Sequence, residues 1–202
     1  MLDQCSYEFC NRGGGVPSPR LLRVSRRLAH QKRNSFDWAF WFLWIMATAW
    51  GWILGSFFAP GVSVVATGIA TGVLQWLLLK QRIPRAWHWI AATAIGWTVG
   101  GLVGSFVLPS ELGFLGAMFL GMATGTAQWL ILRKVVYWAA WWPVVSGVAW
   151  ATGLTLFPAP LLVGVMPGAM TGIALELLLR YARRTNYEQD TVESAHQRLP
   201  SD

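Results

Sequence analysis

Residues 68–80 read GIATGVLQWLLLK, and the pattern returns as GMATGTAQWLILR at 121–133 and as GAMTGIALELLLR at 168–180. Each copy is an apolar run that ends at a basic residue, nine positions after the motif threonine. Such a run is typical of a helix that leaves a membrane on its basic side. Three copies of it predict a membrane protein that is built from a repeated helical unit.

Six apolar stretches cover the middle of the chain, at about 36–58, 62–79, 87–108, 112–132, 135–157 and 161–179. With a rise of about 1.5 Å per residue, helices of these sizes are about 27 to 35 Å long, which matches a hydrocarbon core of about 30 Å. Hydrophobic residues make up 54% of the chain and charged residues only 12%, which is too little charge for the surface of an ordinary soluble domain. We therefore predict an all-α membrane protein with six transmembrane helices.

The first, third and fifth stretches also share a pattern, because WILG, WTVG and WATG begin at Trp52, Trp97 and Trp150. The transmembrane domain, residues 36–184, is thus predicted to consist of three tandem helical hairpins, at about 36–80, 87–133 and 135–180. Each hairpin crosses the membrane twice, so all three enter it in the same direction. This arrangement predicts a pseudo-threefold axis along the membrane normal, unlike the inverted repeats of many transporters.

All sixteen Lys and Arg residues lie on one side of the predicted spans, and the opposite side carries only Glu111. The positive-inside rule makes the basic side the cytoplasm, so both termini are expected there, in a multi-pass protein of the bacterial inner membrane. The net charge of +7 then meets anionic lipid headgroups, and nucleic acid is not expected as a partner. Another membrane protein or a second copy of the chain is the protein partner to consider.

The two ends of the chain are expected to differ in structure. Residues 1–35 form a basic tail in which Leu21, Val24 and Leu28 share one helical face, as in a helix that lies on anionic lipid. A disordered tail, or a wrongly assigned start codon, explains the same residues equally well. The apolar run that follows is too long for a cleavable signal peptide and is interpreted as a signal anchor. Residues 185–202 are polar and are expected to be disordered.

The repeated motif places its small and polar residues at i, i+3, i+4 and i+7, on one helix face. Its glycines are candidate helix-packing residues, because glycines spaced by four let helices approach closely in a bilayer. We favour this role over a ligand groove along the same face. The glycines are Gly68, Gly72, Gly121, Gly125, Gly168 and Gly172, and the threonines between them are Thr71, Thr124 and Thr171.

A candidate polar site inside the membrane consists of these threonines together with Gln75, Gln128 and Glu176. The glutamines are expected to form hydrogen bonds between helices, although a ring of amides that binds a ligand from the cytoplasm is an alternative. The third copy has Leu175 in place of the glutamine. Glu176 is the only acid well inside a span, which raises a proton or cation role. An ion pair with Arg180, four residues further on, is the favoured interpretation.

Twelve of the fourteen tryptophans fall into two groups. An aromatic belt at the cytoplasmic interface is predicted for Trp38, Trp41, Trp76, Trp87, Trp89, Trp129, Trp138, Trp141 and Trp142. Trp52, Trp97 and Trp150 lie deeper, where each indole N–H needs an acceptor. We expect core packing with a carbonyl acceptor rather than stacking on an apolar ligand or pigment.

No HExxH, CxxC, GxSxG or Walker pattern occurs, and the three histidines have no acid or thiol partner in a span, so neither an enzyme nor a metal or cofactor site is expected. The pattern GxxTGxxQWLxLR, within residues 36–184, resembles an uncharacterised group of tryptophan-rich, multi-pass bacterial membrane proteins. The resemblance implies an inner-membrane location and no particular activity.

The sequence therefore favours a non-enzymatic integral membrane protein with a structural, assembly or apolar-ligand-binding role. The alternative is a small-molecule or proton-coupled transporter that uses Glu176 with Gln75 and Gln128. An open pore needs polar residues along its whole length or a gate that dewets. Beyond the glutamines, the motif faces carry only Gly, Ala, Thr and aliphatic residues, which argues against ion conduction.

Overall fold

The computed structural model describes residues 36–59, 61–106, 112–136, 138–156 and 159–196. The chain divides into two units, Met1–Phe36 and Asp37–Asp202, and the second contains all the helices described. The predicted interfacial helix in residues 1–35 lies outside the described residues.

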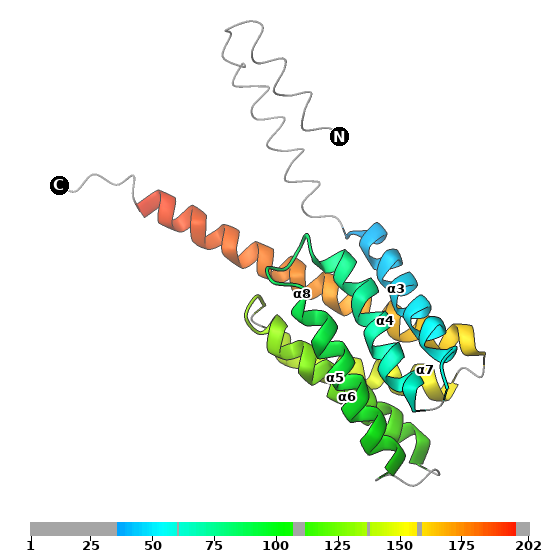
Figure 1. The fold of residues 1–202 in the computed structure, drawn as a ribbon. Coiled ribbons are helices and arrows are strands. Elements are labelled where there is room, and N and C mark those ends of the chain that lie inside the picture. The colour runs from blue at the N-terminus through cyan, green and yellow to red at the C-terminus, as the bar shows by residue number, and fades with distance from the viewer. Residues whose placement is uncertain (1–35, 60, 107–111, 137, 157–158, 197–202) are drawn as a thin grey trace, which may run out of the picture. The chain divides into compact units, whose positions relative to one another are not determined.

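The described part of the second unit consists of helices and short connections and contains no strand (Figure 1). Its elements are α3 (Trp38–Ser56), α4 (Val62–Leu79), α5 (His88–Phe106), α6 (Gly113–Leu132), the short 3-10 helix η2 (Ala139–Trp141), α7 (Trp142–Leu156) and α8 (Pro160–His196). The prediction of an all-α protein is therefore confirmed.

Four of these helices are long and apolar enough to cross a membrane. They are α3, α4, α6 and the Leu162–Tyr181 part of α8. By contrast, α7 has 15 residues, so it is only about 22 Å long and shorter than a hydrocarbon core of about 30 Å. Length and composition thus support a multi-pass membrane protein, and they support four of the six predicted spans.

Local sequence explains where the helices begin and how far they run. The side chain of Asp37 caps α3 by accepting a hydrogen bond from Phe40 N over 3.0 Å. Gly61, with φ of 92°, adopts a backbone conformation that favours glycine, and α4 begins at the next residue. Helix α8 begins at Pro160 and continues to His196, through the segment 185–196 that the sequence predicted to be disordered.

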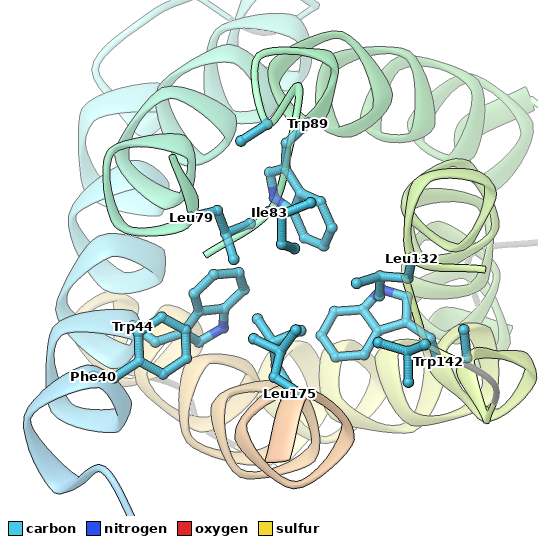
Figure 2. Packing of buried hydrophobic residues seen from close by; sticks show 12 residues of the cluster. Phe40, Trp44, Leu79, Ile83, Trp89, Leu132, Trp142 and Leu175 are labelled. Carbon is cyan, nitrogen blue, oxygen red and sulfur yellow. The ribbon is translucent and has the colours of Figure 1, made fainter. Parts of the chain in front are cut away.

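The six helices form a closed ring. Each helix packs against the next one in the chain, and α3 packs against α8. Figure 2 looks into this ring and shows side chains from all six helices filling its centre. Those buried side chains include Trp44, Leu79, Trp89, Leu132, Trp142 and Leu175.

The motif glycines bring neighbouring helices of the ring together. A Cβ atom added to Gly72 of α4 would lie 3.0 Å from the Cα atom of Ile90 on α5. At Gly125 of α6 the added atom would lie 2.8 Å from Cα of Pro143 on α7. The other four motif glycines face the next helix in the same way, α8 facing α3. At Gly68, Gly121, Gly125 and Gly168 the added atom would lie less than 3.0 Å from the neighbouring helix, and at Gly72 and Gly172 it would lie 3.0 Å away. All six glycines are therefore closely packed against the next helix.

Large apolar side chains cover the outside of the ring. The most exposed of them on α3, α5, α6 and α8 include Phe42, Ile95, Leu102, Phe114 and Leu177, each half exposed or more. An apolar surface of this extent suits contact with lipid rather than with water.

Candidate functional site

Gln75 connects three helices at the centre of the ring. Its Nε2 atom donates to Thr48 Oγ1 on α3 over 3.1 Å, and its Oε1 atom accepts from Trp89 Nε1 on α5 over 2.9 Å. The side chain is buried. A buried amide must be hydrogen-bonded, and both ends of this amide are. Gln75 therefore holds α3 and α5 on either side of α4.

Gln128 repeats this arrangement one hairpin later. Its Nε2 atom donates to Thr93 Oγ1 on α5 over 3.0 Å, and its Oε1 atom accepts from Trp142 Nε1 on α7 over 2.9 Å. Thr93 in turn donates to the carbonyl of Trp89, whose indole binds Gln75. Hydrogen bonds on successive residues thus connect α7 to α3, with Trp89 joining the two sets through its carbonyl and its indole.

The third hairpin breaks the pattern at Leu175, which is fully buried but has no amide. Trp44 on α3 donates instead to Thr171 Oγ1 over 3.1 Å, and Thr171 donates to the carbonyl of Pro167 over 2.5 Å. Ser146 stands on α7 where Thr48 and Thr93 stand on their helices. Because residue 175 is leucine, Ser146 receives no bond from a glutamine.

The sequence prediction misplaced two tryptophans and overlooked a third. Trp89 and Trp142 were assigned to the interfacial belt, which is wrong, because they are 0% and 1% exposed and bind the glutamines. Trp44 belongs to neither group of tryptophans that the sequence predicts. A pattern in the sequence marks all three, since Trp is followed by Thr or Ser at i+4 and by a second Trp at i+8 in WIMATAWGW, WIAATAIGW and WPVVSGVAW, which begin at residues 44, 89 and 142.

The tryptophans at the centre form two layers. The first layer is Trp44, Trp89 and Trp142, with ring centroids 6.0 Å apart for Trp44 and Trp89 and 6.2 Å apart for Trp89 and Trp142. The second layer is Trp52, Trp97 and Trp150, whose centroids lie 4.8 to 6.2 Å apart in every pair. Aromatic rings at these separations attract one another.

The second layer corrects another expectation. The indole nitrogens of Trp52 and Trp97 are buried and have no hydrogen-bond partner, so the predicted carbonyl acceptor is absent for both. Helix carbonyls are already engaged along the helices, and the rings turn toward one another instead. Trp52 and Trp97 are therefore held in this layer by ring packing rather than by an N–H bond to the backbone.

A small polar cavity lies between the two layers. The space that the centre of a water molecule can occupy in this cavity is about 10 Å³. Its lining contains tryptophan, threonine, glutamine and serine and no charged side chain; the residues are Trp44, Thr48, Thr71, Gln75, Thr93, Trp97, Thr124, Gln128, Trp142, Ser146, Trp150 and Thr171. The structure thus brings five of the six predicted polar-site residues together. It adds two further threonines, one serine and two tryptophans from each layer to them.

Glu176 is the sixth of those residues, and it does not line the cavity. Its Oε2 atom accepts from Arg82 Nη1 over 3.1 Å, although the carboxylate side chain is only 2% exposed. The predicted ion pair with Arg180 is therefore wrong in its partner. Arg82 lies in the connection from α4 to α5, and the folded ring carries it to Glu176, which sequence spacing does not reveal.

Arg82 also binds the residue that caps the first helix. Its Nη2 atom forms an ion pair with Asp37, and its guanidinium carbon lies 4.0 Å from the ring centre of Phe40. Stacking on an aromatic face and pairing with carboxylates both suit a guanidinium. One side chain thus joins the start of α3, the α4–α5 connection and α8.

No protein-family model matches this chain, and comparisons with curated proteins and with solved structures return no match.

Proposed function

We propose that this chain is a non-enzymatic integral membrane protein of the bacterial inner membrane, in which all six helices cross the bilayer. Three helical hairpins are related by a pseudo-threefold axis along the membrane normal, through the centre of the ring. Two findings support this arrangement. Gln75 and Gln128 bind the same residue types on the neighbouring helices, and the motif glycines of α4, α6 and α8 all face the next helix in the ring.

The basic end of the ring is proposed to face the cytoplasm, with both termini on that side. Lys80 and Arg133 are exposed where α4 and α6 end, and each lies over a tryptophan ring, at 5.7 Å and 5.2 Å from its centre. Such cation and tryptophan pairs suit the level of anionic headgroups. Anionic lipid is therefore the proposed partner at this face.

The proposed role is structural, in membrane assembly or scaffolding, and the filled centre of the ring is the observation that carries it. Tryptophans of both layers line the cavity, and buried leucines lie with the first layer in one core cluster. The glutamine amides are used in hydrogen bonds between helices, and Glu176 is paired with Arg82 outside the cavity. A transporter needs a path with polar groups along it. In this chain the two amides and the carboxylate instead bind other helices and connections of the ring.

Purification in a mild detergent, followed by native mass spectrometry of the lipids, pigments and proteins that stay bound, tests this role. We expect a bound membrane protein or a second copy of the chain. Flux assays in proteoliposomes are the counterpart, and they are expected to show no transport of small ions. Solute flux above that of empty vesicles, with no retained protein, would replace the structural role by transport.

Topology is tested independently of the role. Reporter fusions at residues 61, 110 and 159 are expected outside the cytoplasm, and fusions at residues 82 and 134 inside it. A cytoplasmic reporter at any of the first three positions would reject the proposed orientation.

A further inference from the structure

We propose that the central cavity binds one neutral, hydrogen-bonding molecule of the size of water. The cavity lies between the two tryptophan layers and has about 10 Å³ for the centre of a water molecule. That space corresponds to about one molecule, and a buried water also needs two or more polar partners. Binding at this cavity does not depend on the proposed role in the membrane.

Two buried polar groups of the lining lack a partner in the protein. The indole nitrogen of Trp97 has none although the residue is 3% exposed, and the hydroxyl of Thr71 has none although the residue is 1% exposed. The equivalent hydroxyls of Thr124 and Thr171 donate to the carbonyl four residues earlier. Thr71 therefore keeps a donor and an acceptor, and the Trp97 N–H in the same lining needs an acceptor.

The third hairpin explains why the centre has room and polarity for a ligand. Leu175 cannot make the bridge that Gln75 and Gln128 make, so Ser146, which lines the cavity, receives no hydrogen bond from an amide at position 175. A glutamine at position 175 would have accepted a hydrogen bond from Trp44, which donates to Thr171 instead. A small molecule that both donates and accepts hydrogen bonds complements these groups.

The chemistry of the lining sets the charge of the ligand. All twelve lining residues are neutral, and Arg82, which forms ion pairs with Asp37 and Glu176, is not among them. An ion without a compensating charge is costly to bury. The site therefore selects a neutral molecule, and water is the probe that tests it.

The test is an NMR measurement of contacts between water and indole N–H groups in the full-length protein, labelled with ¹⁵N-tryptophan in detergent micelles. We expect the Trp97 Nε1–H to show a cross-peak to a long-lived water. Trp52 is the matched control, because its indole nitrogen is also buried and unpartnered but the residue does not line the cavity. No cross-peak at Trp97, or equal cross-peaks at both tryptophans, would overturn the proposal.

Two substitutions then locate the molecule. Thr71→Val removes the free hydroxyl with little change of shape, and Leu175→Gln supplies the third amide, which the chain already accommodates at 75 and 128. We expect the Trp97 cross-peak to be weakened by the first change and lost with the second. Persistence of the full cross-peak in both variants would place the water elsewhere. If Leu175→Gln does not fold, the wild-type comparison and Thr71→Val still decide.

Discussion

Arg82 and Glu176 lie 94 residues apart in the chain, yet Arg82 Nη1 donates to Glu176 Oε2 over 3.1 Å. The same guanidinium binds Asp37 at the start of α3. The two carboxylates belong to the first and last helices of the ring, which pack against each other and close it. This closing contact is also where Leu175 leaves out the glutamine bridge, so the ion pairs of Arg82 add a polar connection where the amide is missing.

Replacing Arg82 by glutamine is expected to lower the free energy of unfolding by about 3 kcal/mol, because it removes the cation from a carboxylate that is almost fully buried. Thermal unfolding of the detergent-purified protein measures the effect. Lys134→Gln is the matched control, since it removes the same charge from an exposed position. Equal stability of the two variants would mean that the ion pairs of Arg82 contribute nothing.

Glu176→Gln separates the structural role from proton-coupled transport. A glutamine still accepts a hydrogen bond from Arg82, and Arg82 keeps Asp37, so we expect a loss of about 1 kcal/mol or less and a normal fold. A proton carrier, however, cannot be replaced by a group that does not titrate. Flux in vesicles that depends on pH, and that disappears in Glu176→Gln while the protein stays folded, would favour transport.

Gln75→Leu tests the glutamine bridge. It leaves the indole N–H of Trp89 buried without its acceptor, and the expected loss of stability is about 1 to 2 kcal/mol. Gln128→Leu should cost a similar amount, because its hydrogen bonds have the same partners in type. Gln81→Leu, at an exposed position, serves as the control. Thermal unfolding that ranks all three variants alike would show that the bridges are unimportant.

Gly125→Leu is expected to damage folding or assembly severely, by about 3 kcal/mol or more, because overpacking forces backbones apart. An added Cβ atom already meets Pro143 Cα at 2.8 Å, and no rotation of the side chain relieves that contact. Gly113→Leu is the control, since no atom lies within 4 Å of its added Cβ. The yield of monodisperse protein and its thermal stability measure the difference, and equal values would place Gly125 outside a close contact.

Gln75 shows how much of the site can be predicted from local sequence. The spacing of Gly72 and Gln75 puts both residues on one helix face, and the structure has both buried on α4. The identity of their partners does not follow from that spacing. Thr48 and Trp89 belong to the two neighbouring helices, and only the rotation of each helix in the ring brings them to the amide.

Trp89 and Glu176 show where prediction from local sequence fails. Trp89 stands near the end of a helix, which in sequence is typical of an interfacial belt, but packing turns it to the centre of the ring. Glu176 and Arg180 have helical spacing for an ion pair, yet Arg82 reaches the carboxylate from another hairpin. Position along a helix is local information, whereas the direction in which a side chain points depends on neighbours.

The sequence by itself determined the apolar helical segments, their basic ends and the recurring glycines, because hydrophobicity, charge and helical period are properties of residues close together in the chain. Only the tertiary structure decided which helices meet to close the ring, which tryptophans face its centre, that the indoles of Trp52 and Trp97 go without an acceptor, and that a small neutral cavity remains beside Ser146. These features depend on contacts between segments far apart in the sequence, whose geometry is set by packing.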